Sequence, residues 1–160
     1  MGLYKHLPLV FIMSISMGCN TASSSYEPLD LMSHGMPIKV MAPANSVIEM
    51  DDLGIMKDLT VIDTSNGGFN IQIFSSKTDK LDKPKVLAES KSEIESTEFF
   101  SKIISEDENG FIYEKKVTED YINYDFRVIR LQGDVKYVIQ SGFGEQYELE
   151  DIKRMFDAVK

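Results

Sequence analysis

Short segments with alternating apolar and polar residues recur along the chain, and this alternation predicts β-strands. They form two groups of three: residues 38–41, 59–64 and 69–73, then residues 111–117, 122–131 and 135–141. Ser65-Asn66-Gly67-Gly68 separates two strands of the first group and is typical of a hairpin turn. Phe69, Ile71 and Ile73 alternate with polar residues, so one face of that strand is expected to be buried.

Two other segments repeat their apolar residues at helical spacing. Asp82-Lys83-Pro84 has the features of a helix start, with Asp82 as N-cap and Pro84 in the first turn. Apolar residues follow up to Ile104, which predicts one long helix over Pro84–Ser105. The spacing of Leu149, Ile152, Met155, Phe156 and Val159 predicts a shorter amphipathic helix at the C-terminus. Acidic residues come first and basic residues later, an order that complements the helix dipole.

The predicted order is therefore three strands, a long helix, three strands and a short helix. Runs of strands separated by helices indicate an α+β fold with an antiparallel sheet. We expect a single domain over residues 37–160, with a sheet of five to seven strands, the long helix across one face and the C-terminal helix packed nearby. A chain of 160 residues suits one such domain.

The N-terminus has the pattern of a sorting signal. A short n-region with Lys5 precedes an apolar stretch from Leu7 to Met17, which is too short to span a bilayer. Ser16-Met17-Gly18-Cys19 then resembles the lipobox of bacterial lipoproteins, although Ser16 stands where an aliphatic residue is usual. We interpret residues 1–18 as a signal peptide and residues 19–36 as a lipidated cysteine with a flexible tether. The alternatives are an ordinary secreted protein and a buried free thiol.

The lipobox resemblance implies that acyl chains on Cys19 hold the protein to a membrane. Asn20 next to the cysteine resembles the enterobacterial signal for transfer to the outer membrane, so we expect an outer-membrane lipoprotein that faces the periplasm. Cys19 is the only cysteine, which rules out an internal disulfide. The formal net charge of −9 argues against nucleic acid as a partner, because phosphate binding needs a basic surface.

The order of elements resembles the PsbP-like fold, which includes the DcrB-like envelope lipoproteins. The resemblance covers roughly residues 37–160 and rests on that order, on Phe99-Phe100, and on the final Met155-Phe156-Asp157-Ala158-Val159. It implies an accessory binding protein or a chaperone, and it carries no catalytic signature.

Few residues in the sequence offer catalytic or metal-binding chemistry. His34 is the single histidine after Cys19, and Ser141-Gly142-Phe143-Gly144 has no base spaced to activate its serine. Thioether and imidazole groups of Met32, His34 and Met36 could together hold Cu(I), although methionine also fills irregular packing gaps. We expect no cofactor and no enzyme activity.

Aromatic residues in the second half offer a binding surface instead. Tyr113, Tyr124 and Tyr137, with Arg127, have the composition of a protein interface if part of the sheet is open. The alternative is a sheet face packed under a helix. We therefore expect a non-enzymatic accessory or binding protein for another envelope component. A periplasmic chaperone, an immunity-type inhibitor and, less favoured, a carboxylate-based hydrolase remain as alternatives.

Overall fold

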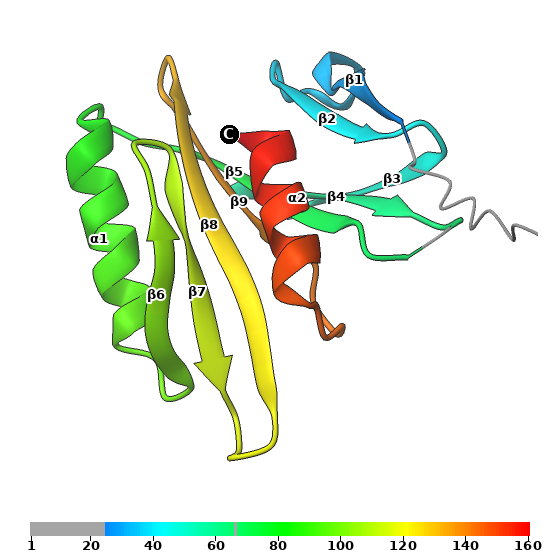
Figure 1. Ribbon diagram of the computed structural model, residues 1–160. Helices are drawn as coiled ribbons and strands as arrows, with labels where there is room; N and C mark the ends of the chain where they lie inside the picture. Colours follow the sequence, from blue (N-terminus) through cyan, green and yellow to red (C-terminus); the bar gives the residue numbers. More distant parts are fainter. Residues whose placement is uncertain (1–24, 66) are drawn as a thin grey trace, which may run out of the picture.

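Seven antiparallel strands form the main sheet, in the order β3-β4-β5-β9-β8-β7-β6 (Figure 1). The computed structural model describes residues 25–65 and 67–160. The strands are β3 (Ser46–Asp52), β4 (Met56–Asp63), β5 (Asn70–Lys77), β6 (Phe100–Glu106), β7 (Gly110–Lys116), β8 (Ile122–Gln132) and β9 (Val135–Ser141). The expected α+β class with an antiparallel sheet is confirmed.

A second sheet of two strands precedes the main one. β1 (Tyr26–Asp30) pairs with β2 (Lys39–Pro43), and the short 3-10 helix η1 (Met32–His34) connects them. Leu31 and Met36 in this connection are fully buried, at 0% exposure. The expectation of a flexible tether up to residue 36 is therefore wrong for residues 26–36, because their apolar side chains complete the core. The signal peptide, Cys19 and the rest of the expected tether up to residue 24 lie outside the described residues.

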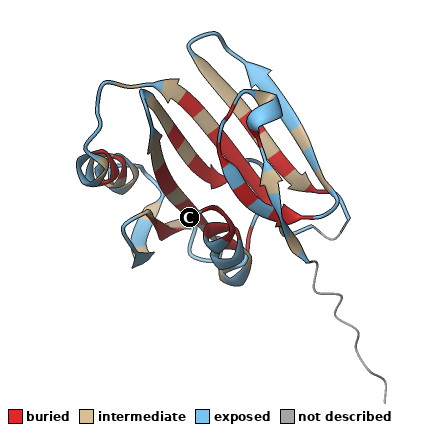
Figure 2. Ribbon diagram, turned by 90° about the horizontal axis from the view of Figure 1, so that it is seen from above, coloured by how far each residue is buried: buried red, intermediate tan, exposed pale blue. Residues whose placement is uncertain are grey.

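Helix α2 (Leu149–Val159) contains the apolar residues whose spacing predicts a C-terminal helix, and it covers one face of the sheet. Its buried side chains include Ile152, Met155 and Phe156, and Phe156 packs edge-on against Phe126 of β8 with 6.0 Å between ring centroids. The same core cluster takes in apolar residues of β2, β4, β5 and β9. Figure 2 shows the buried residues on the sheet and on the sides of the helices that meet it.

Helix α1 (Lys83–Glu95) packs on the opposite face, over a second and smaller apolar cluster. Val86 and Leu87 of α1 contribute to this cluster together with Phe111, Tyr113 and Ile129 of the sheet. Asp82 caps the helix as predicted, since its side chain accepts the Lys85 N–H at 3.2 Å. Among the described residues, no helix is both long and apolar enough to cross a membrane.

The predicted long helix over Pro84–Ser105 is wrong in its second half. The helix ends at Glu95, where the hydroxyls of Ser96 and Thr97 donate to the backbone carbonyls of Glu93 and Ile94. Residues 100–106 form β6 instead, and the register of β6 on β7 shifts twice, between Phe100 and Lys102 and between Ile103 and Ser105. Such bulges replace the two-residue period of a strand by longer spacings, which resemble helical spacing in the sequence.

Substitution of Leu31 tests whether the N-terminal segment belongs to the domain. Leu31→Ala should lower the free energy of unfolding by about 2–5 kcal/mol, because it leaves a cavity in the core. Met32→Ala is the matched control, since the adjacent side chain is 62% exposed and its loss should change stability by less than about 0.5 kcal/mol. Urea unfolding of both variants gives the comparison, and equal stabilities would show that residues 26–36 do not contribute to the core.

Candidate functional site in the gap between β8 and β9

Strands β8 and β9 pair along only part of their length. Their register runs from Gln132 opposite Val135 to Val128 opposite Ile139. Beyond this last pair, β8 continues toward Ile122 with β7 as its neighbour, and β9 continues to Ser141 with β5 as its neighbour. The two strands therefore part in the middle of the sheet, which leaves backbone groups on both sides without a ladder partner.

The carboxylate of Asp125 fills this gap. Its Oδ1 accepts the Phe126 N–H at 2.7 Å, the Ser141 N–H at 3.2 Å and the Ser141 hydroxyl at 2.7 Å. Its Oδ2 accepts the Tyr113 hydroxyl at 3.0 Å and the Lys115 ammonium at 2.9 Å. Donors from β7, β8 and β9 thus converge on one side chain, and they replace the missing ladder bonds.

This network is largely shielded from water. The Asp125 side chain is 9% exposed and that of Lys115 is 30% exposed, so the ion pair lies at the boundary between protein and solvent. Burial, followed by the negative charge of Asp125, raises the pKa of Tyr113 above its usual range. Tyr113 therefore stays a neutral donor, while Lys115 supplies the compensating positive charge.

The segment after β9 is held close to the gap. The Gly142 N–H donates to the Asn70 carbonyl at 2.8 Å, and a Cβ at position 142 would lie 2.0 Å from the Asn70 side-chain oxygen. A side chain at position 142 would therefore force the buried Asn70 side chain to move. Asn123 accepts the Tyr147 N–H at 3.0 Å, which fixes the far end of the segment against β8. Phe143 is thereby presented at the mouth of the gap.

A pocket of about 340 Å³ opens over this network. Its floor includes Lys115, Asn123, Asp125 and Ser141, and its rim includes Phe99, Val117, Tyr121 and Phe143. The rim side chains are unusually exposed for their type: Phe143 is 74%, Phe99 44% and Tyr121 41% exposed. A concave site with convergent polar groups and an exposed aromatic rim has the make-up of a binding site.

The four predicted binding residues are divided between the two faces of the sheet. Tyr113 belongs to the apolar cluster under α1, and its hydroxyl donates to Asp125 in the floor of the pocket. Arg127 follows Asp125 by two residues in β8 and so lies on the α1 face as well. Its buried Nε has no hydrogen-bond partner among the described residues. Tyr124 and Tyr137 belong to the core on the α2 face. The structure therefore does not bring the four residues together.

The predicted copper ligands lie in different surroundings. Met32 and Met36 are only four residues apart, at η1 and the turn that follows it. Met36 is nevertheless fully buried, whereas Met32 is 62% exposed. No cluster of three or more His, Cys, Asp or Glu residues with metal-binding geometry occurs in the described part of the chain. The lipidation site Cys19 is outside that part.

The sequence does not single out Asp125 or Lys115, and the predicted binding residues are not those of the aromatic rim. Asp125 stands between Tyr124 and Phe126, and simple alternation assigns such a residue to a polar, solvent-facing side. The one sequence feature that points to Asp125 is its position between two aromatic residues of a strand. Ser141 has no base spaced to activate it as a nucleophile. Its hydroxyl in fact donates to Asp125, whose oxygens already accept four further donors.

No protein-family model matches this chain, and no curated protein matches it in sequence. The role of the pocket is therefore inferred from its own geometry.

The raised pKa of Tyr113 predicts a specific pH dependence of stability. The contribution of Tyr113 to the free energy of unfolding is fully present below the pKa of an unfolded tyrosine, about 10. This contribution is lost as the pH rises from there through the pKa of Tyr113 in the folded protein. Tyr113→Phe removes this pH dependence. Above about pH 10, the free energy of unfolding of the variant should therefore fall less steeply than that of the wild type, and the two slopes should differ by up to about 1.4 kcal/mol per pH unit.

Urea unfolding at a series of alkaline pH values measures both slopes. Burial also raises the pKa of Tyr147, and this contribution is present in both proteins, so it does not affect the difference. Parallel curves for the wild type and Tyr113→Phe would contradict the assignment of Tyr113 as a buried neutral donor.

Proposed function

We propose that the protein is a membrane-anchored extracytoplasmic lipoprotein that binds another envelope protein through the pocket over Asp125, without catalysing a reaction. The lipobox-like Ser16-Met17-Gly18-Cys19 supports the anchor, and Asn20 supports an outer-membrane location that faces the periplasm. The general role agrees with the resemblance to the PsbP-like fold. In this proposal the occupant of the pocket is an apolar side chain of the partner, carried on a basic segment.

The exposed aromatic rim is the observation that carries the proposal. Phe99, Tyr121 and Phe143 come from three separate segments of the chain, yet all three line one pocket and remain exposed. Large aromatic side chains gathered around a hollow favour association, because covering them removes apolar surface from water. The floor is already satisfied by internal hydrogen bonds, so it offers a fixed shape and needs little reorganisation on binding.

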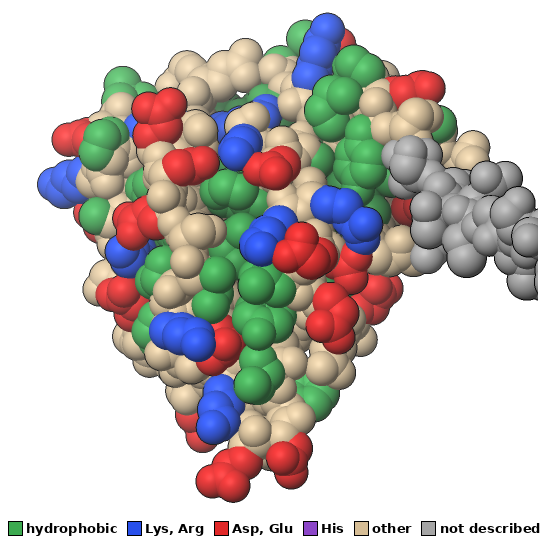
Figure 3. All heavy atoms as spheres, in the orientation of Figure 1, with side chains coloured by type: hydrophobic (Ala, Val, Ile, Leu, Met, Phe, Trp, Pro, Cys, Tyr) green, Lys and Arg blue, Asp and Glu red, His purple; other side chains and the backbone are tan. Residues whose placement is uncertain are grey.

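Acidic side chains around the rim favour a basic partner segment. Glu145 lines the pocket, Glu98 precedes Phe99, and Glu119 and Asp120 precede Tyr121. None of these four forms an ion pair among the described residues. Opposite charges across an interface steer partners together and select among them. Figure 3 views the molecule from the side of α2, where side chains of both signs are mixed, without a gathering of Lys and Arg that would suit nucleic acid.

The position of the anchor is consistent with a partner at the membrane surface. Tyr26 packs edge-on against Phe69 with 5.4 Å between ring centroids, and the next residue, Asn70, accepts the Gly142 N–H beside the pocket. The seven residue steps from Cys19 to Tyr26 span at most about 25 Å when fully extended. A lipid on Cys19 would therefore keep the pocket end of the sheet close to the bilayer and raise its local concentration for surface partners.

Site-specific photo-cross-linking in native membranes tests this function. A benzophenone amino acid at position 143 or 99 of the full-length protein should give one discrete protein adduct. The adduct at position 143 should weaken as salt is raised, because the acidic surroundings are screened. Leu81 is the control position, since it is 67% exposed and does not line the pocket.

The pattern of adducts decides between the proposal and its alternatives. Equal adducts at positions 143 and 81, or none at either rim position, would contradict a docking site at the pocket. A ladder of many different proteins would contradict one specific partner and favour a chaperone instead.

A further inference from the structure

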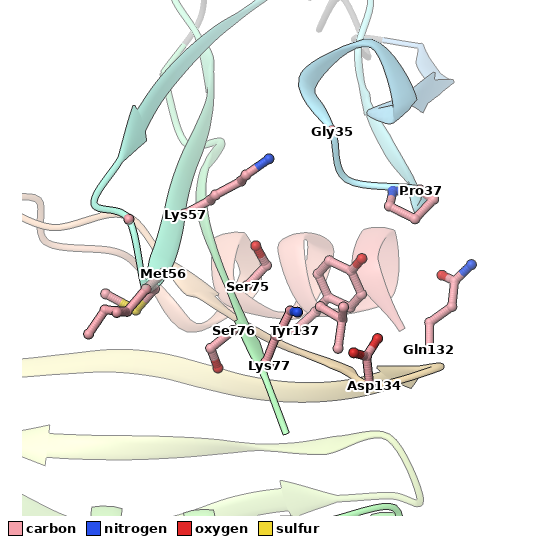
Figure 4. A pocket seen from close by; sticks show the side chains of 13 residues that line it. Gly35, Pro37, Met56, Lys57, Ser75, Ser76, Lys77, Gln132, Asp134 and Tyr137 are labelled. Carbon is pink, nitrogen blue, oxygen red and sulfur yellow. The ribbon is translucent and has the colours of Figure 1, made fainter. Parts of the chain in front are cut away.

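A second pocket lies at the other end of β9, between the β1–β2 segment and the main sheet. Its volume is about 440 Å³, within the range of small-molecule sites. Gly35 and Pro37 of the β1–β2 connection line one side, and the main sheet lines the other (Figure 4). It includes Tyr137 at the start of β9, whereas the first pocket includes Ser141 at the end of this strand.

Three polar side chains on adjacent strands point into this second pocket. Lys57 of β4 stands opposite Ser75 of β5, and Ser75 stands opposite Tyr137 of β9. Because directly paired residues share a face, the three form one row across the sheet. Figure 4 shows their polar ends directed to the same side, toward the β1–β2 connection. The row thus places an ammonium group and two hydroxyl groups, all able to donate hydrogen bonds, along one cavity wall.

Lys57 has no acidic partner in the described part of the chain. No Asp or Glu oxygen there lies within 4.0 Å of its ammonium, although the protein has a net charge of −9. Its Nζ lies under Gly35, where an added Cβ would be only 2.8 Å away. No side-chain hydrogen bond joins the hydroxyl of Ser75 or of Tyr137 to another described residue. A partly buried cation beside two free donors is suited to an anion.

The other lining residues limit the charge and shape of that anion. Two lysines, Lys57 and Lys77, and one aspartate, Asp134, give the lining a formal charge of +1. Met56 and Val135 on the sheet, and the exposed Ile55 in the β3–β4 turn, add apolar surface. A single negative charge with a short aliphatic portion matches this combination better than a multiply charged phosphate.

The geometry points to a binding site for a small aliphatic monocarboxylate in the pocket beneath Gly35. The carboxylate accepts from the Lys57 ammonium and from the hydroxyls of Ser75 and Tyr137, and the aliphatic portion lies toward Ile55 and Val135. This site is separate from the pocket over Asp125, and its occupancy does not depend on a protein partner.

Calorimetric titration of the full chain with hexanoate tests the site. Saturable binding with a Kd on the order of 1 mM is expected for a ligand of this size. Lys57→Met should raise the Kd at least about tenfold, and Tyr137→Phe should raise it severalfold by removing one donor. Lys85→Met is the matched control, because it removes the same charge from an exposed position on α1 and should leave the Kd unchanged.

Two comparison probes test the ligand class. 1-Hexanol lacks the charge and inorganic phosphate lacks the aliphatic portion, so both should bind at least about tenfold more weakly than hexanoate. The thermal unfolding midpoint checks that each variant is folded. Tyr137→Phe keeps the buried ring and gives an independent reading if Lys57→Met does not fold. Absence of saturable hexanoate binding, equal binding of either comparison probe, or an unchanged Kd in both Lys57→Met and Tyr137→Phe would overturn the proposal.

Discussion

The carboxylate of Asp125 holds together the part of the sheet where β8 and β9 separate. An unpaired backbone N–H in a buried position costs free energy comparable to a lost hydrogen bond. Asp125 removes this cost for Phe126 and Ser141 at once, and it takes two more donors from β7. Its own charge is stabilised by these donors and by Lys115. Asp125 therefore stabilises the separation of the strands, which creates the pocket.

Both pockets arise where a regular ladder is interrupted or covered. At one end of β9, the loss of pairing with β8 opens the pocket over Asp125. At the other end, the β1–β2 connection covers the sheet and leaves the second pocket beneath it. Arg130 of β8 holds β2 and the end of α2 to the sheet, because it donates to the carbonyls of Lys39 and Lys160. Helix α2 packs on one face and α1 on the other, so the sheet between the two ends has little freedom to adjust. Rigid surroundings of this kind preorganise a binding site.

Local patterns predicted much of the fold. Helix α2, strand β9 and the β4–β5 hairpin follow from amphipathic periodicity, alternation and the Gly67-Gly68 turn, which are properties of neighbouring residues. Strand β6 was misread as helix, because its two bulges alter the alternation. Strand β3 was missed because its side chains are mostly exposed and include several acids, so no buried face marks it.

The candidate sites were harder to predict, because they depend on contacts between distant residues. Asp125 meets Ser141, and Lys57 meets the turn at Gly35, only after the sheet has assembled. The sequence predicts Tyr113 and Tyr137 as aromatic residues of one interface, but Tyr113 donates to Asp125 and Tyr137 lines a separate pocket. Alternation tells which residues share a face of one strand. It does not tell where two strands will part.

The stability of Asp125→Asn tests the central role of this carboxylate most directly. The amide has no negative charge to compensate Lys115, and its NH₂ group would face other hydrogen-bond donors. The free energy of unfolding should therefore fall by about 3 kcal/mol. Asp120→Asn makes the same change at an exposed position and should alter stability by less than about 0.5 kcal/mol. Urea unfolding at neutral pH measures both. An Asp125→Asn variant as stable as Asp120→Asn would contradict the account.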